Sequence, residues 1–444
     1  MRGHFRERGG IARTASSTLA VQLVTYGLVF AVSILVARGL GPSGRGEYYI
    51  PVTAGAVALV LVHLGLEGAN TYFVAGRQLT VRQIAAAAAL LAPVCGLFGG
   101  AVLTLVFVLT RDSLFQGVSW SAFVIAPALL TFQLYLLWAT NVFTLAGKVT
   151  RAQAAQLLGA LGQFLLLVPV VRAGRLTVEY ALATYAVFIL IPCAALVFWS
   201  RSFAPARPRF DPQVLRMLLT FGLKLQIGQI FFYLLLRADT FVINTMLGAR
   251  DVGVYSLTVL LAEAVMLLTM PLVLAVLPVQ ATLGMHDAGL MSFKAARFNG
   301  VFALALAVCA ACTMWLGIPL LYGDEFRSAY PALMALMPGV VAFAVARPLG
   351  NWLVRHGQPW LLSGLGAGAF AVNMVLNIVL LPVMGIVGAS VASSIAYIAL
   401  VAAMVAWGMK STGLTLKAAL IPNASDVASV RQAILGRRLR GVGR

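Results

Sequence analysis

Charged residues are scarce in this sequence. Asp, Glu, Lys and Arg make up 10% of its 444 residues, against about 25% in ordinary soluble domains. Hydrophobic residues make up 61%, and the mean hydropathy is +0.95. This composition excludes an ordinary water-soluble protein and predicts a chain that crosses a membrane many times. The apolar runs are about 20 residues long, which suits transmembrane helices better than the alternating strands of a membrane barrel.

Residues that carry enzymatic chemistry are also few. The sequence has 13 acidic residues and four cysteines, and it contains no nucleophile elbow, zinc-protease helix, Walker loop or paired aspartate cluster. Cys309 and Cys312 have the spacing of a redox or metal pair, but a second pair or a nearby His is missing. We therefore predict that all four cysteines, Cys95 and Cys193 included, are small buried packing residues. We expect no enzymatic activity, no cofactor and no bound metal.

The charge that is present is mostly positive. The net charge is +19, which in a soluble protein would suggest a nucleic-acid partner, but no nucleic-acid motif accompanies it. The basic residues lie between apolar segments, where they report orientation and lipid contact. The tail at 410–444 is especially basic, and we expect it to lie against the anionic cytoplasmic leaflet, either as a short helix over 424–440 or as a disordered end.

Apolar runs bounded by charge, Gly and Pro predict twelve transmembrane helices. The first follows an Arg-rich N-terminus and is too long for a usual signal peptide, so we expect it to remain uncleaved. With the N-terminus in the cytoplasm, most of the 32 Lys and Arg residues fall on the cytoplasmic side, Arg347 among them. Arg38 and Arg45 are assigned to loops on the outer side of the membrane. This bias predicts that both termini are cytoplasmic. The ranges are 18–38, 48–75, 83–110, 120–145, 152–171, 178–199, 214–245, 252–278, 298–321, 329–350, 360–382 and 387–409.

A polar, Pro-rich connection at 201–213 separates six predicted helices from the next six. We therefore predict an N-terminal lobe at 1–200, a cytoplasmic linker at 201–213 and a C-terminal lobe at 214–409, followed by the basic tail.

A short turn occurs once in each predicted lobe. Leu40-Gly41, Gly46 and Tyr48 recur 207 residues later as Leu247-Gly248, Gly253 and Tyr255. Because each lobe has an even number of helices, the repeat is parallel, and both turns lie on the outer side. Leu and Gly are common in this chain, so a chance match is the alternative.

The seventh predicted helix contains three charged residues, which cost on the order of 2.5 to 3.5 kcal/mol each inside a bilayer. Such side chains are expected to face a hydrated cavity. Lys224 lies deep in the helix and is the better candidate for an anion contact. A straight helix cannot present all three on one face. Arg237 and Asp239 either line the cavity or lie near the outer interface and pair with each other or with neighbours.

Other polar side chains inside the predicted membrane region suggest ion coupling. Glu263 lies near the middle of the eighth helix, where we expect it to be protonated or paired with a cation such as Lys224 or Arg237. Its role is either to couple transport to an ion or to hold helices together as a fixed ion pair. In the second helix His63, Glu67 and Asn70 share one face, which suits proton handling. Uncharged groups that could bind sugar hydroxyls or hold helices together are Gln133, Asn141, Gln226 and Gln229.

Several runs together resemble the polysaccharide biosynthesis (Wzx-like) flippases of the multidrug/oligosaccharidyl-lipid/polysaccharide exporter superfamily. These are VARGLGPSGRGEYY at 36–49, LRADTFV at 236–242 followed by the second turn, and LNIVLLP and GIVGASVAS at 376–393. The resemblance implies a V-shaped, MATE-like pair of six-helix bundles in a bacterial cytoplasmic membrane. It implies that alternating access moves a polyprenyl-diphosphate-linked oligosaccharide outward through a cationic cavity, where Lys224, Arg237 and Arg38 fit the role of binding the diphosphate.

We also expect membrane lipids, H⁺ or Na⁺, and a polysaccharide polymerase or ligase as partners. Three alternatives remain. A drug/cation antiporter of the same superfamily would favour an acidic cavity, and a lipid II-type precursor flippase would favour more than twelve helices. A membrane glycosyltransferase, polymerase or ligase would need a large outer loop or clustered acids, which the sequence does not contain.

Overall fold

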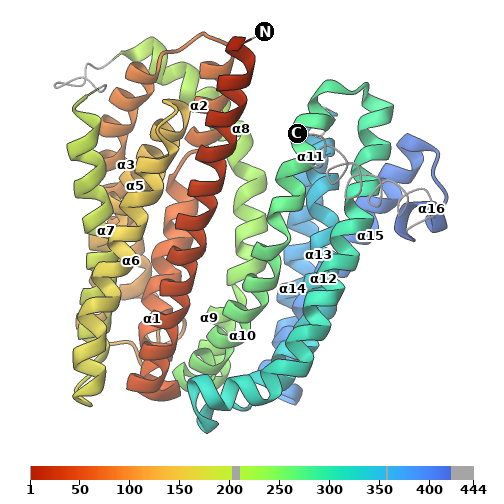
Figure 1. The fold of residues 1–444 in the computed structure, drawn as a ribbon. Helices are drawn as coiled ribbons and strands as arrows, with labels where there is room; N and C mark the ends of the chain where they lie inside the picture. Colours follow the sequence, from red (N-terminus) through yellow and green to blue (C-terminus); the bar gives the residue numbers. More distant parts are fainter. Residues whose placement is uncertain (1, 203–210, 357–358, 422–444) are drawn as a thin grey trace. The chain divides into compact units, whose positions relative to one another are not determined.

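The computed structural model describes residues 2–202, 211–356 and 359–421 (Figure 1). Every regular element in these ranges is helical, which confirms the all-α prediction. The elements are α1 (Arg2–Val62), α2 (Leu66–Ala75), α3 (Val81–Thr110), α4 (Trp120–Phe123), α5 (Ile125–Leu145), α6 (Val149–Arg172), α7 (Val178–Ser200), α8 (Pro212–Arg237), α9 (Asp239–Leu247), α10 (Ala249–Leu268), α11 (Met270–Thr282), α12 (Met285–Tyr322), the short 3₁₀ helix η1 (Asp324–Phe326), α13 (Ala329–Arg355), α14 (Pro359–Met384), α15 (Ile386–Thr412) and α16 (Leu416–Leu420).

Eleven segments within the described ranges are long and apolar enough to cross a membrane. The first of them, 20–62, contains Gly41 with φ 65° and ψ −176°. That conformation favours glycine, and Pro42 then lacks the N–H that would continue the helix. The chain therefore turns inside α1, and its two arms correspond to the first two predicted helices. Counting the arms separately gives the twelve predicted membrane crossings.

The second predicted helix, 48–75, is wrong as an unbroken element. The chain leaves the helix after Val62, with φ 58° at Leu64 and φ 62° at Gly65, and resumes as α2. Gly65 is required here, because a Cβ at this position would lie 2.3 Å from the carbonyl oxygen of Gly222 in α8. A close approach between two backbones, which hydropathy does not register, thus sets the break.

Two further predicted helices are interrupted. The seventh divides at Ala238 into α8 and α9, and the eighth divides at Thr269 into α10 and α11. Pro271 in the first turn of α11 supplies no N–H, so the ladder cannot continue through it. The ninth helix is longer than predicted, since α12 already begins at Met285.

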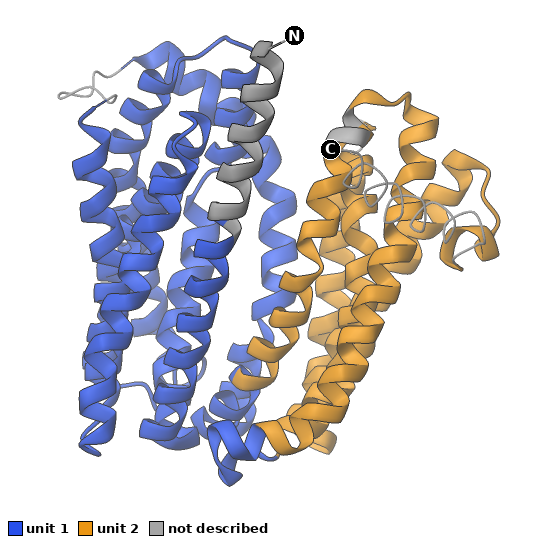
Figure 2. Ribbon diagram, viewed as in Figure 1, with its two compact units in different colours: residues 1–256, 318–327 blue, residues 257–317, 328–444 orange. Residues whose placement is uncertain are grey.

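The described chain forms two compact units, coloured separately in Figure 2. One consists of residues 1–256 and 318–327, and the other of residues 257–317 and 328–444. These units are defined by packing, whereas the predicted lobes are defined by the polar connection at 201–213 and the six predicted helices on each side of it. The lobe boundary at 201–213 therefore stays a prediction, and residues 203–210 of it, like the tail from 422 onward, lie outside the described residues.

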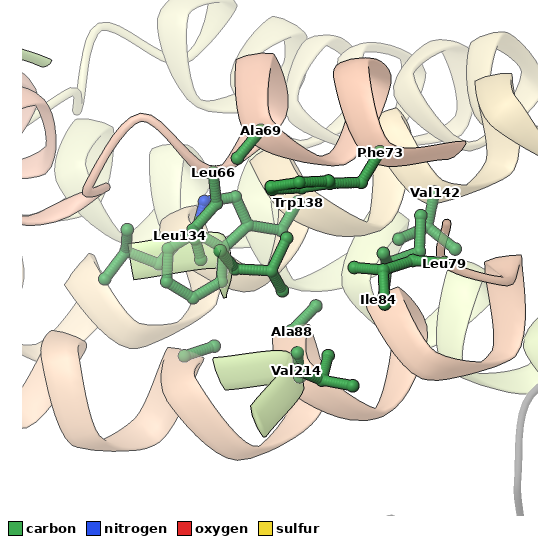
Figure 3. Close-up of a cluster of buried hydrophobic side chains, with 13 residues drawn as sticks. Leu66, Ala69, Phe73, Leu79, Ile84, Ala88, Leu134, Trp138, Val142 and Val214 are labelled. Atoms are coloured by element: carbon green, nitrogen blue, oxygen red, sulfur yellow. The ribbon is translucent and has the colours of Figure 1, made fainter. Parts of the chain in front are cut away.

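The core of the first unit lies where α2, α3, α5 and α8 meet (Figure 3). Trp138 and Leu134 of α5 are fully buried, and they pack in one cluster with Ile84 of α3 and Leu218 of α8. Burying a large apolar side chain contributes about 1.5 to 3 kcal/mol. This cluster fixes α8, which carries the predicted site residues, against the helices of the first unit.

The cysteine prediction is wrong for two of the four residues. Cys193 is buried and Cys95 is half-buried, but Cys309 and Cys312 are exposed on α12. The reasoning failed because an apolar sequence context predicts contact with lipid as readily as contact with protein. A small apolar side chain on a membrane helix needs no burial in the fold.

Candidate functional site

The predicted cation Lys224 is exposed on α8. Asp211 starts this helix, since its Oδ1 accepts the backbone N–H groups of Gln213 and Val214 at 3.0 and 3.2 Å. The buried positions of α8 include Gly222 and Gln226, and Lys224 lies between them, turned away from the packed side. Gln229 is also exposed. Both residues are thus accessible on the surface of the first unit, and their place in a substrate cavity stays a prediction.

Gln226 has a different environment from Lys224. It is 3% exposed, and its Nε2 donates to the backbone carbonyl oxygen of Val60 in α1. Its Oε1 is buried and has no hydrogen-bond partner among the described residues. Gln226 therefore holds α8 against the end of α1, where the second membrane crossing breaks.

Arg237 and Asp239 lie on either side of the break at Ala238. Arg237 Nη1 donates to Tyr49 Oη at 3.2 Å, and the guanidinium lies over the ring of Tyr233, 5.8 Å from its centroid. Asp239 is 2% exposed, and its carboxylate accepts the N–H of Thr240 at 2.8 Å and the hydroxyl of Tyr255. Because α8 ends between them, the angles predicted for a straight helix do not apply.

His63 and Glu67 are brought together as predicted, but not by a continuous helix. His63 Nδ1 lies 3.3 Å from Glu67 Oε2, and it also accepts the N–H of Gly65 at 3.2 Å. These contacts exclude each other chemically, because a protonated Nδ1 donates to the carboxylate and can no longer accept from Gly65. His63 Nδ1 therefore lies within reach of two groups at the break, the Glu67 carboxylate and the Gly65 N–H.

The uncharged polar residues of the first unit form separate contacts. Asn70 Nδ2 donates to Asn141 Oδ1 at 3.2 Å, which joins α2 to α5. Gln133 Nε2 donates to Tyr185 Oη at 3.2 Å, while Gln133 Oε1 is buried without a partner in the described structure. The Tyr185 ring packs edge-on against Tyr48, with 6.4 Å between centroids. These residues hold helices together, and their predicted contact with sugar hydroxyls stays untested.

Glu263 lies in the second unit, half-buried on α10. Within that unit it interacts electrostatically with Arg347 of α13, whose guanidinium lies over the Phe343 ring at 5.8 Å. Arg347 was assigned to a cytoplasmic loop by the charge count. Its position inside the predicted tenth helix was the signal that could have identified it as a partner for Glu263.

Sequence reasoning missed the buried Arg45. It was assigned to an outer loop, but it lies in α1 beyond the turn at Gly41 and is 5% exposed. Its Nε donates to Ser256 Oγ at 2.7 Å, and its two terminal nitrogens donate to the carbonyl and hydroxyl oxygens of Ser33 at 2.9 and 3.0 Å. Arg38 is exposed and donates to the carbonyl oxygens of Leu321 and Leu320 at 2.8 and 2.5 Å.

No cluster of three or more His, Cys, Asp or Glu residues that could hold a metal exists among the described residues. Apart from Glu67 and Asp211, the cations and carboxylates described above lie within helical segments that are long and apolar enough to cross a membrane.

Comparisons with solved structures identify the fold. A multidrug resistance MATE family transporter of the MOP superfamily, in its inward-facing conformation, is 16% identical with a TM-score of 0.68, covering 90% of this chain and 98% of its own. The lipid II flippase MurJ is 12% identical with a TM-score of 0.66, covering 90% and 88%. A MOP superfamily transporter from Pyrococcus furiosus, described as having a binding pocket of reversed polarity, is 12% identical with a TM-score of 0.62, covering 91% and 95%.

The sequence comparisons give one match. A search of curated proteins finds no significant similarity. The profile of a family described as polysaccharide biosynthesis protein matches residues 36–331, which is more than half of the chain and includes both copies of the repeated turn. The family predicted from the short sequence runs is confirmed by this match. The chain therefore belongs to the polysaccharide biosynthesis protein family, and its fold is that of the MOP superfamily transporters.

Proposed function

We propose that this protein is a flippase that moves a polyprenyl-diphosphate-linked oligosaccharide from the inner to the outer leaflet of a bacterial cytoplasmic membrane. The observation that carries the proposal is an exposed lysine, Lys224, within a membrane-spanning segment of a polysaccharide biosynthesis family member. A diphosphate that crosses the hydrocarbon core needs nearby cations and water to offset the loss of its hydration. Lys224 supplies such a cation, and Arg237 and Arg38 supply further positive charge.

The acidic side chains are proposed to couple transport to H⁺ or Na⁺. The contacts of His63 with Glu67 and Gly65 provide a nitrogen whose proton uptake changes its partner. Glu263 interacts electrostatically with Arg347, Asp239 accepts the hydroxyl of Tyr255, and both carboxylates lie within membrane-spanning segments. A polysaccharide polymerase or ligase would then use the oligosaccharide delivered to the outer leaflet.

Reconstitution tests the function directly. The purified protein is placed in lipid vesicles with a fluorescent polyprenyl-diphosphate oligosaccharide, a lipid II analogue or a cationic dye, and a membrane-impermeant quencher reports the outer-leaflet fraction. We expect the diphosphate-linked oligosaccharide to change leaflets faster than in protein-free vesicles, and the dye to stay where it is. Faster movement of the lipid II analogue would assign the peptidoglycan precursor instead. Dye movement driven by an ion gradient, without lipid movement, would establish a drug antiporter.

A further inference from the structure

An aromatic surface lies where α2 packs against α8 in the first unit. The ring of Tyr72 in α2 stacks on the ring of Phe221 in α8, with 4.4 Å between their centroids and 19° between their planes. Phe73 contacts both rings edge-on, at 5.2 and 5.5 Å, and belongs to the buried cluster of Figure 3. Tyr72 itself is 54% exposed. Its ring is therefore fixed from one side by packing and accessible to a ligand from the other.

Polar groups of α2 border the exposed ring. Glu67 and Thr71 are four residues apart, so they share a face of the helix next to Tyr72. His63 Nδ1 lies 3.3 Å from Glu67 Oε2 and helps to hold the carboxylate in place. The exposed Thr71 hydroxyl donates its proton to the backbone carbonyl oxygen of Glu67 at 2.7 Å, so toward a ligand its oxygen acts as an acceptor. This border thus offers acceptors for hydroxyl groups.

A cation lies beside the same surface on α8. Lys224 is exposed and follows Phe221 by three residues, so the two side chains leave one side of the helix on neighbouring turns. Helical side chains tilt toward the N-terminus of their helix, which directs Lys224 back over the turn that carries Phe221. By the helical rise, Lys224 lies about 18 Å from the start of α8, and Tyr72 lies about 5 Å from the end of α2. The predicted topology places both of these helix ends at the cytoplasmic side, so the ring is nearer the cytoplasm than the cation.

This surface differs from an exposed ring in an apolar setting. On α3 the exposed Phe98 has only aliphatic side chains among its exposed large neighbours on the helix, Val94, Leu97 and Val102, as suits contact with lipid tails. Tyr72 instead has hydroxyl and carboxylate acceptors on one side and a lysine on the other. The face of an aromatic ring carries partial negative charge, which attracts the C–H groups on the apolar face of a sugar ring. The sugar's hydroxyls, around its edge, then need acceptors.

We propose that Glu67, Thr71, Tyr72, Phe221 and Lys224 form a sugar subsite, which binds the sugar attached directly to the diphosphate of the lipid-linked oligosaccharide. The apolar face of the sugar lies on the Tyr72 ring, its hydroxyls donate to Glu67 and Thr71, and the diphosphate contacts Lys224. The identity of the substrate in this assignment rests on the proposed function. In the inner leaflet the sugars extend from the diphosphate toward the cytoplasm, which is the direction from Lys224 to Tyr72.

Binding of two kinds of probe tests the subsite. The first is a short-chain prenyl diphosphate, and the second is the same lipid carrying glucose, galactose or N-acetylglucosamine on the diphosphate. Titration calorimetry of the purified protein in detergent measures the dissociation constants. We expect the wild-type protein to bind at least one sugar-bearing probe about tenfold more tightly than the sugar-free probe. Tyr72→Ala should remove this preference without changing the affinity for the sugar-free probe, whereas Lys224→Ala should weaken the binding of both.

Three further variants isolate the role of the ring. Tyr72→Phe keeps an aromatic face and should keep the preference for the sugar. Tyr72→Leu keeps apolar bulk without a flat ring and should lose it, which provides a second test if Tyr72→Ala does not fold. Phe98→Ala is the matched control, because it removes an exposed ring from α3, and it should change neither affinity.

The outcomes separate the subsite from the proposed substrate. A preference for the sugar that persists in folded Tyr72→Leu would overturn the subsite. The subsite alone also fails if the wild-type protein binds the sugar-free probe equally well while it still moves the lipid-linked oligosaccharide in vesicles. If the wild-type protein binds no prenyl diphosphate, with or without a sugar, the proposed substrate and the subsite are both rejected.

Discussion

Replacing Lys224 by Ala is expected to reduce translocation of the lipid-linked oligosaccharide by at least about tenfold while protein levels stay normal. A charged group in the hydrocarbon region costs on the order of 2.5 to 3.5 kcal/mol, and about 1.4 kcal/mol already corresponds to a tenfold change. Losing half of the free energy by which Lys224 offsets this cost for a diphosphate is therefore enough to slow translocation tenfold. The measurement is surface polysaccharide in cells that depend on this protein, together with the leaflet assay in vesicles.

Two control variants separate the effect of the positive charge at position 224 from the effect of the protein's overall positive charge. Lys224→Arg keeps the positive charge and should retain most of the activity. Lys417→Ala removes an exposed lysine outside the membrane-spanning segments and should have no effect. Wild-type export by Lys224→Ala would remove this residue from the mechanism.

Glu263→Gln and Arg347→Gln are each expected to abolish export and to lower thermal stability. Each single variant removes the opposite charge with which the remaining side chain interacts electrostatically. Removing one member of a fully buried pair costs roughly 3 to 5 kcal/mol, and because both side chains here are only half-buried we expect about 1 to 2 kcal/mol. Thermal unfolding of the purified protein measures the stability, and surface polysaccharide measures the export.

The double variant Glu263→Gln with Arg347→Gln decides what the pair is for. Two neutral amides in the same place should recover most of the stability, since both charges are removed together. If Glu263 couples transport to an ion, export stays absent in the double variant. If export returns together with stability, the pair only fastens α10 to α13, and the coupling role is lost.

The membrane helices could be predicted from the sequence because their signal is local. Apolar runs about 20 residues long must form helices in a bilayer, because a helix satisfies the hydrogen bonds of its own backbone N–H and C=O groups. The break at Leu64 could not be predicted in this way, since it depends on a tertiary contact. At Leu64 the decisive contact is the approach of Gly222 in α8 to Gly65, two residues that are far apart in the sequence.

The charged residues show the same limit. Lys224 and Glu263 were identified because a charge in the middle of an apolar run is conspicuous. Arg45 and Arg347 were missed because counting positive charges assigns every cation near a predicted helix end to water. The fold instead surrounds Arg45 with hydroxyl, carbonyl and aromatic groups, which makes a buried arginine tolerable without a carboxylate.

The length of α12 determines how its unit meets the membrane surface. Its 38 residues extend about 57 Å at 1.5 Å per residue, nearly twice the hydrocarbon thickness of about 30 Å. Its first turns, with Lys294 and Arg297, therefore reach beyond the hydrocarbon, where Arg297 binds the carbonyl oxygen of Ala418 in α16 at 2.5 Å. With the predicted topology this end meets the inner headgroup layer, whose negative surface potential acts on the half-buried Lys294, while Arg297 is buried within the fold. If the protein is a flippase, as proposed, we expect its turnover to depend on the proportion of anionic lipid around this end of α12.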